Sequence, residues 1–292
     1  MKSATIRIGI SGWRYPPWRG VFYPKDLPQR GELEFASREL ATIEINGSFY
    51  SLQRPQSYES WYAATPAGFR FSVKAPRYIT HIRRLREIEK PLANFFASGI
   101  FRLREKLGPI LWQFPPSMHY DAELFEQFLA LLPHDTHAAQ SLARRREPRM
   151  KGRSSLVVDR KRALRHAIEI RHESFRDRGF IELLRRHGAA LVVADTAGKW
   201  PYLEDITADF LYLRLHGDEE LYASGYTEAA LKRWAARIRK WNEGGQPDRG
   251  ARVSKKPPPG RKGRDVYCYF DNDRKVKAPA DAKSLAKRLG LR

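Results

Sequence analysis

The segment Ala-Thr-Ile-Glu-Ile-Asn-Gly-Ser-Phe-Tyr at residues 41–50 begins as a short apolar strand and ends in an aromatic turn. Glu44 and Asn46 lie two residues apart, so on a strand both side chains point to the same face. Gly47 follows them and favours a turn. A carboxylate and an amide that share a face at the carboxyl end of a strand are typical of a ligand-binding site.

The same arrangement recurs along the whole chain. Apolar or alternating segments predict eight strands, at residues 6–10, 42–46, 69–75, 109–114, 166–171, 189–195, 210–215 and 265–270. Helical patterns are predicted at 32–40, 56–64, 91–107, 121–132, 177–187, 228–241 and 280–289. Residues 196–209, between the sixth and seventh strands, carry no helical pattern.

Strands that alternate with helices over 292 residues predict a (β/α)₈ TIM barrel, formed as one domain from residues 1–292. An open doubly wound sheet would also use parallel strands. However, no glycine-rich phosphate loop follows the first strand, so the barrel is preferred.

The net charge of +21 is concentrated in two segments. Residues from about 134 to 165 carry a net charge of +7, and residues 243–264 carry +5. Both segments are interpreted as basic loop insertions in the barrel. They could bind nucleic acid through its phosphates without reading sequence. The alternative is that they are solvated loops in a host with basic proteins.

The cysteine and hydropathy patterns indicate the compartment. Cys268 is the one cysteine and lies in an apolar strand, which excludes an internal disulfide and predicts a buried thiol. The chain shows no charged leader with a cleavage site and no apolar run long enough to cross a membrane. We therefore expect a cytoplasmic protein without a membrane partner.

Polar residues collect where the predicted strands end. In a barrel these ends converge on one mouth, which is where TIM-barrel active sites lie. The candidate catalytic residues are Glu44, Glu169, Asp195, His216 and Asp271. The candidate substrate-binding residues are Asn46, Tyr50, Lys74, Gln113, Arg171, Trp200, Tyr202, Arg214, Tyr222 and Asn272. The alternative interpretation is a salt-bridge layer that closes the barrel without chemistry.

The residue types at the mouth suggest a chemistry for each. Lys74, Arg171 and Arg214 would form a cationic ring for a phosphate or carboxylate. His216 is the best candidate for a proton shuttle. A divalent metal is possible, because histidine and carboxylates are present, but no compact metal-binding motif supports it and the cofactor stays unknown. His81 and His172 are interpreted as structural hydrogen-bonding residues that could also join the mouth.

Several motifs resemble those of a known family. They are Ser-Gly-Trp-Arg-Tyr-Pro-Pro-Trp-Arg-Gly-Val-Phe-Tyr-Pro (11–24), Glu-Ile-Asn-Gly-Ser-Phe-Tyr (44–50), Phe-Ser-Val-Lys-Ala-Pro-Arg (71–77), Leu-Trp-Gln-Phe-Pro-Pro (111–116), Glu-Ile-Arg-His (169–172), Leu-Arg-Leu-His-Gly (213–217) and Tyr-Phe-Asp-Asn-Asp (269–273). In this order they resemble the YecE-like proteins, domain of unknown function 72. The resemblance covers most of the chain outside the two insertions. It implies a TIM barrel and supplies no established reaction.

Three functions follow as hypotheses. The first is a hydrolase or nuclease-like enzyme that acts on phosphate esters, with nucleic acid as one such substrate. The second is an acid-base isomerase or lyase that acts on a small phosphorylated or carboxylated sugar. The third is a non-catalytic protein that binds nucleic acid through the basic insertions.

Overall fold

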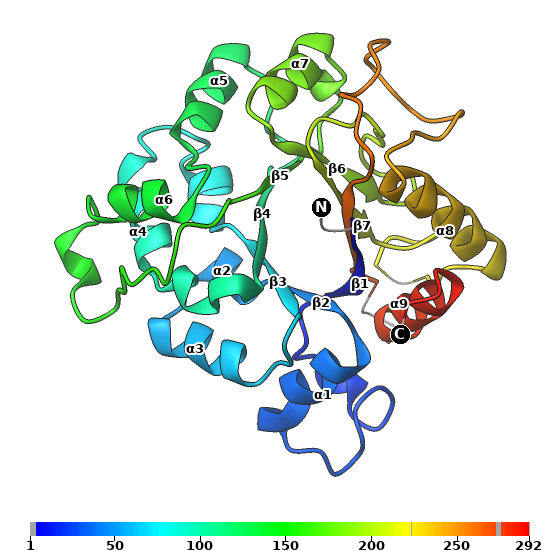
Figure 1. Cartoon of the computed structure of the whole chain (residues 1–292), viewed down its shortest axis with the longest axis horizontal. Coiled ribbons are helices and arrows are strands. Elements are labelled where there is room, and N and C mark those ends of the chain that lie inside the picture. The colour runs from blue at the N-terminus through cyan, green and yellow to red at the C-terminus, as the bar shows by residue number, and fades with distance from the viewer. Residues whose placement is uncertain (1–3, 223, 273–275, 292) are drawn as a thin grey trace.

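The computed structural model describes residues 4–222, 224–272 and 276–291. Eight parallel strands, each paired with the next along the chain, close into a barrel surrounded by helices (Figure 1). This confirms the predicted TIM barrel. The strands are β1 (Ile6–Ser11), β2 (Thr42–Ile45), β3 (Arg70–Lys74), β4 (Leu107–Gln113), β5 (His166–Glu169), β6 (Ala190–Asp195), β7 (Phe210–Leu215) and β8 (Asp265–Phe270).

The α-helices lie on the outside of the barrel, where their apolar faces cover the strands (Figure 1). They are α1 (Glu32–Glu39), α2 (Gly47–Tyr50), α3 (Pro55–Ala63), α4 (Glu89–Ala97), α5 (Ala122–Leu131), α6 (Thr136–Ala143), α7 (Arg178–Arg186), α8 (Glu228–Asn242) and α9 (Ala278–Arg288). Two helices begin with a side-chain cap. The Asp121 side chain accepts a hydrogen bond from the Leu124 backbone N–H, and Thr227 accepts one from Ala230. None of the described helices is long and apolar enough to cross a membrane.

The single helix predicted over residues 91–107 is wrong. Helix α4 ends at Ala97, and Gly99 follows with a φ of 104°. A Cβ atom at Gly99 would lie 2.5 Å from Cα of Pro55 at the start of α3, so only glycine allows this close approach. The chain then continues as a 3₁₀-helical segment, η4 (Ile100–Lys106).

The connection between β6 and β7 has no helix, as the sequence predicted. The second basic insertion covers this gap, and Figure 1 shows it in orange between α7 and α8. The carboxylate of Asp205 accepts hydrogen bonds from the backbone N–H groups of Val253 and Ser254, at 2.8 and 2.9 Å. The insertion therefore takes the position that a helix occupies elsewhere around the barrel.

The first basic insertion is partly helical, since it contains α6. Its backbone is tied to α4 by two bonds: Glu147 N–H donates to Asn94 Oδ1, and Ser155 N–H donates to the Ala97 carbonyl, both at 2.9 Å. The insertion is thus attached to the barrel wall along α4.

The barrel interior has its own cluster of buried side chains, taken from alternate strand positions such as Ala190, Val192 and Ala194. Its middle is polar as well as aromatic. The hydroxyl groups of Ser72 and Tyr212 lie 2.6 Å apart, and those of Thr42 and Tyr269 lie 2.9 Å apart. Cys268 is buried, as predicted, and burial raises the pKa of its thiol. Side chains alternate between the inside and the outside of the barrel up to the strand ends. The last inward-facing residue of each strand therefore faces the mouth.

Candidate functional site

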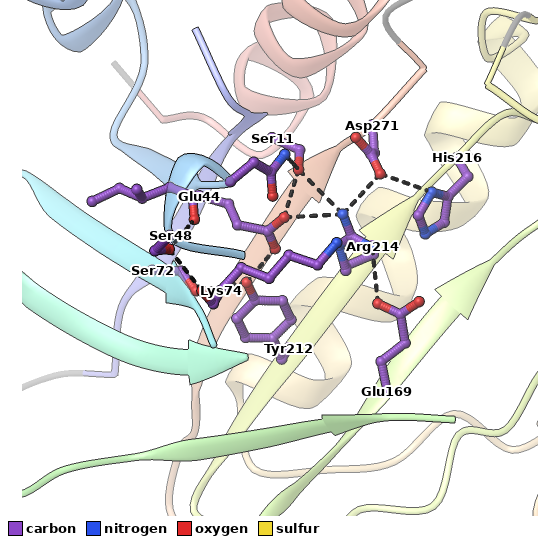
Figure 2. A network of polar contacts seen from close by, with 12 residues as sticks. Ser11, Glu44, Ser48, Ser72, Lys74, Glu169, Tyr212, Arg214, His216 and Asp271 are labelled. Carbon is purple, nitrogen blue, oxygen red and sulfur yellow. Dashed lines mark hydrogen bonds and ion pairs between the residues drawn. The ribbon is translucent and has the colours of Figure 1, made fainter. Parts of the chain in front are cut away.

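Arg214, at the end of β7, is the centre of the mouth. Its side chain is 1% exposed, and three carboxylates from three other strands surround it (Figure 2). Nη1 lies 2.8 Å from Oε2 of Glu169, while Nη2 lies 2.9 Å from Oε1 of Glu44 and 2.7 Å from Oδ2 of Asp271. The guanidinium group has a fixed planar geometry, so this arrangement also fixes the positions of the carboxylates.

Glu44 is held by further hydrogen bonds from neighbouring strands. Ser11 Oγ donates to Oε1 and the Tyr212 hydroxyl donates to Oε2, each at 2.5 Å. The Asn46 amide donates to Ser11 Oγ at 2.9 Å. Our sequence reasoning missed Ser11 and Tyr212. Tyr212 lies two residues before Arg214 and so on the same face of β7, where the period-two pattern could have found it. Ser11 lies one residue beyond the predicted first strand.

Two carboxylates of this layer, Glu169 and Asp271, stay ionised at neutral pH. Burial alone would raise the pKa of Glu169, but Arg214 and Arg171 hold it well below its usual range. The pKa of Asp271 is lowered in the same way, against its burial, by Arg214 and His216. A group that stays ionised is a poor proton donor. Glu169 and Asp271 are therefore suited to organising charge at the mouth.

Lys74, at the end of β3, is also buried, but unlike Arg214 it packs against an aromatic ring. Its side chain is 8% exposed, and Nζ has no hydrogen bond or ion pair with any described residue. Nζ lies 4.3 Å from the centre of the Phe49 ring. Burial, together with the nearby charge of Arg214, lowers the pKa of Lys74 to about 8. About a tenth of this amine is thus unprotonated at pH 7, and about half at pH 8.

His81 also packs against Phe49. It belongs to a π-helical turn, η3 (Tyr78–Ile82), and such turns are often found at functional sites. Its Nδ1 lies 2.8 Å from the Thr80 hydroxyl, and its ring meets the Phe49 ring edge-on at 5.1 Å. Burial and the charges of Lys74 and Arg171 lower the pKa of His81 to about 4. His81 therefore has the predicted structural hydrogen bond and is also a neutral base at the mouth.

The opposite side of the mouth is lined by Arg171 and His216. Arg171 Nε donates to Oε1 of Glu169 at 2.9 Å, and its guanidinium carbon lies 3.8 Å from the centre of the Trp200 ring. His216 is fully buried, with Nδ1 3.1 Å from Oδ2 of Asp271, and the Tyr222 ring packs against it at 5.2 Å. Burial, and then Arg214, lower the pKa of His216, so the imidazole is neutral.

Several buried polar atoms at the mouth lack a hydrogen-bond partner among the described residues. They include Oδ1 of Asn46, Oε1 of Gln113 and both ring nitrogens of His216, as well as Nε of Arg214. Nδ1 of His216 lies 3.1 Å from Oδ2 of Asp271 as an ion-pair contact. Buried polar groups are normally paired. Three unpaired groups at the ends of β2, β4 and β7 indicate a place where a ligand binds.

Other predicted site residues point elsewhere. Asp195 follows the inward-facing Ala194 and therefore points outward, where it accepts a 3.1 Å hydrogen bond from the Tyr226 hydroxyl. Asn272 likewise lies outside the barrel and donates to Asp281 of α9 at 2.8 Å. The Tyr202 hydroxyl bonds to Glu204, and its ring packs against Trp234 of α8. Asp273 of the quoted motif lies outside the described residues.

A cavity of about 510 Å³ adjoins the mouth. Phe49 separates it from Lys74, and Tyr50, Pro76, Tyr78 and Arg149 line the rest. Tyr50 is 72% exposed at its edge. The predicted substrate-binding residue Tyr50 thus belongs to this cavity, beside the Arg214 layer.

No group of three or more His, Cys, Asp or Glu side chains in the described part of the chain has the geometry to hold a metal ion. Glu44, Glu169 and Asp271 are all directed at Arg214. A cation at this position would have to displace a guanidinium group, so these residues do not fit a metal site as they are arranged.

Comparison with known proteins identifies the family. The family model described as "Protein of unknown function DUF72" matches residues 7–292. The chain belongs to the DUF72 family. Two curated relatives carry the name UPF0759. YunF of Bacillus subtilis (strain 168) is 29% identical over 116 residues, which is 38% of this chain and 40% of YunF. YecE of Escherichia coli (strain K12) is 28% identical over 110 residues, 38% of each protein.

Solved structures of DUF72 proteins share the fold. The crystal structure of the protein from Thermotoga maritima MSB8 superposes with a TM-score of 0.75 at 24% identity, covering 98% of this chain and 99% of that one. A second structure, from Enterococcus faecalis V583, gives 0.67 at 17% identity and covers both chains completely. These similarities establish the DUF72 barrel, and the matched stretch spans only about two fifths of the curated relatives' length.

Proposed function

We propose that this DUF72 protein is an acid-base lyase or isomerase, acting at the mouth on a small carbonyl compound that carries a phosphate or carboxylate. The observation that carries the proposal is Lys74, a buried amine without a polar partner among the described residues and with a pKa of about 8. Lys106, which is equally buried, provides a contrast within the same molecule. Its Nζ donates to the backbone carbonyls of Tyr62 and Thr65, both at 2.6 Å. Lys74 makes no such bond with any described residue, so in the unprotonated form its lone pair is available for chemistry.

The chemistry that suits this amine is imine formation. The unprotonated Nζ of Lys74 forms a C–N bond to the substrate's carbonyl carbon. The carbonyl oxygen takes up two protons, one from the amine and one from the medium, and leaves as water. The resulting protonated imine withdraws electrons from the neighbouring carbon, so that a C–H or C–C bond there can break.

Two further residues have complementary roles in this proposal. Neutral His81, which contacts the same Phe49 ring as Lys74, would accept the proton released from the substrate carbon. Nε and Nη2 of Arg171 both contact Glu169, and Nη1 has no hydrogen-bond partner among the described residues. Nη1 is therefore available to bind the substrate's phosphate or carboxylate.

The geometry supports this chemistry better than metal-assisted hydrolysis of phosphate esters, which the sequence also suggested. Hydrolysis of that kind needs carboxylates free to bind the metal ion and its water. Glu44, Glu169 and Asp271 instead bind Arg214.

Borohydride trapping tests the proposal directly. Purified protein is incubated with pyruvate, with an aldose phosphate or with a ketose phosphate, then reduced with sodium borohydride and analysed by intact mass and peptide mapping. We expect a stable adduct on Lys74, formed faster as the pH rises toward about 8 and at a constant rate above it. Lys74→Met should abolish the adduct.

Lys199→Met is the matched control, since Lys199 is an exposed lysine on the same rim, 5.3 Å from the Trp200 ring. This variant should retain the adduct. Exchange of substrate C–H for deuterium in D₂O provides a second measurement that does not depend on trapping. If no compound gives an adduct on Lys74 and none exchanges hydrogen, the proposal is wrong.

A further inference from the structure

A second concave site lies at the amino end of the barrel, opposite the mouth. It is a cleft of about 1,380 Å³, lined by residues at or just before the first positions of several strands, among them Arg7 of β1, Arg70 of β3, Arg165 before β5 and Asp265 of β8. In TIM barrels this end usually serves stability. The composition of the cleft therefore needs another explanation.

Both basic insertions contribute to this cleft. Arg160 and Arg162 come from the first insertion, and Arg261 and Lys262 come from the second, about a hundred residues later in the chain. The insertions are attached to different parts of the barrel wall, α4 in one case and the β6–β7 connection in the other. Their cationic side chains nevertheless line the same concave surface.

Positive charge exceeds negative charge in the cleft. Seven lysines and arginines line it against four acidic residues. Arg165 forms ion pairs with two of the acidic residues, at 2.7 Å from Asp265 and 3.2 Å from Asp209. A third acid, Glu105, lies 3.8 Å from Arg162.

The remaining cations have no ion pair with any described residue. They are Arg7, Arg70, Arg160, Arg261 and Lys262. Burial, and then the charge of Arg7, lower the pKa of Arg70, while Tyr267 and Glu105 oppose this in part. Like charges held together without counter-charges cost stability. A bound polyanion would remove that cost.

We infer that this amino-end cleft binds a nucleic acid through its phosphate backbone. The cations are contributed by separate segments of the chain and line one large cleft, which suits a row of phosphates better than one small anion. Arginine predominates, and its planar fork matches phosphate oxygens. The aromatic residue in the lining, Tyr267, is 5% exposed and offers no surface for base stacking. Binding should therefore show little dependence on base sequence.

The experiment is fluorescence anisotropy of a labelled 20-nucleotide RNA and a labelled 20-base-pair DNA duplex titrated with the full chain. We expect the affinity to fall at least about tenfold between about 50 mM and about 200 mM KCl, because phosphate contacts release counterions. The paired substitution Arg261→Glu/Lys262→Glu, at exposed positions on the cleft edge, should weaken binding at least about tenfold.

A charge-matched control separates the cleft from the overall net charge. Lys232→Glu/Arg233→Glu changes two exposed cations on α8 that have no ion pair with described residues and lie outside the cleft. This variant should keep its affinity within about twofold. Equal losses in both double variants would mean that net charge alone binds the nucleic acid, and would overturn the inference. Absence of binding at about 50 mM KCl would do the same.

Inorganic phosphate distinguishes a backbone groove from a small-anion site. At equal ionic strength, millimolar phosphate should displace the RNA no better than chloride does. Full displacement by phosphate would indicate a site for a single small anion and would contradict the inference. None of these measurements depends on Lys74, so failure here leaves the proposed reaction intact, and failure of trapping leaves the cleft intact.

Discussion

The two ends of the barrel use the same strands to build opposite electrostatic environments. At the mouth, Lys74, Arg171 and Arg214 face an equal number of carboxylates, and Arg214 contacts all three of them. At the amino end, Arg7 and Arg70, near the starts of β1 and β3, have no ion pair with any described residue. Strand β3 carries both kinds of residue, Arg70 at its start and Lys74 at its end.

This difference shows how a network of charges can fix geometry or recruit a partner. A closed network satisfies its own charges, so its atoms are fixed before any ligand arrives. An open set of cations stays unsatisfied until an anion binds. The mouth combines the two, because the closed Arg214 layer surrounds one amine that it does not neutralise.

The largest change in stability is expected from a substitution that breaks the ion pairs around Arg214. Arg214→Met would leave Glu44, Glu169 and Asp271 buried without their shared partner, and should lower the free energy of unfolding by about 3–5 kcal/mol at pH 7. Arg70→Met, at the other end of the barrel, removes a cation that others repel and should change the free energy of unfolding by less than about 1 kcal/mol. Urea denaturation of both variants measures the contrast.

The pH dependence of that loss provides a second check. In the wild type the folded pKa of Glu169 lies below its ordinary value of 4.5, so its stabilising contribution is present above pH 4.5 and is lost as the pH falls below it. The difference between wild type and Arg214→Met should therefore shrink below pH 4.5. A constant difference would contradict the assignment of the loss to the carboxylates.

Much of this architecture was readable from the sequence, because strands have a period of two and parallel strands end together. The eight strands, the barrel and the convergence of Glu44, Glu169, Arg214 and Asp271 follow from that pattern. Strict use of the same period would also have placed Asp195 outside the barrel, since Ala194 before it faces inward. Asp195 was predicted as a site residue because it ends a strand, although the alternation along β6 directs its side chain away from the barrel interior.

Other features have no local signal in the sequence. Which carboxylates share one guanidinium group depends on the stagger of the strands around the barrel. The π-helical turn that brings His81 beside Phe49 carries no distinctive residue pattern. The amino-end cleft joins Arg162 to Arg261 across about a hundred residues, and only the closed fold brings them together.

A smaller effect should arise from the amine that the mouth leaves unpaired. Lys74→Met removes a buried charge that has no polar partner among the described residues, and should raise the free energy of unfolding by about 1 kcal/mol at pH 7. The pKa of Lys74 is about 8 in the folded chain against an ordinary 10.5, so the unfolded chain binds more protons between these values. Wild-type stability should therefore rise with pH across that window, and the advantage of the variant should shrink.

Urea denaturation at pH 7 and at about pH 9.5 measures this effect, with Lys199→Met as the exposed control. The control should match the wild type at both pH values. A loss of stability in Lys74→Met at pH 7 would show that the amine is satisfied in the folded chain, and would remove the basis for its reactivity.

The smallest predicted effect concerns screening in the open cluster. Raising KCl from about 50 mM to about 500 mM should stabilise the wild type by about 0.5 kcal/mol more than Arg7→Gln, because salt weakens the repulsion that Arg7 exerts on Arg70. Arg38→Gln on α1 is the opposite control, since Arg38 lies 2.8 Å from Glu34 in an exposed pair that salt weakens. Salt should therefore stabilise this control variant more than the wild type. If Arg7→Gln and Arg38→Gln responded to salt in the same direction, the amino end would not hold uncompensated charge, and the electrostatic contrast between the two ends of the barrel would not exist.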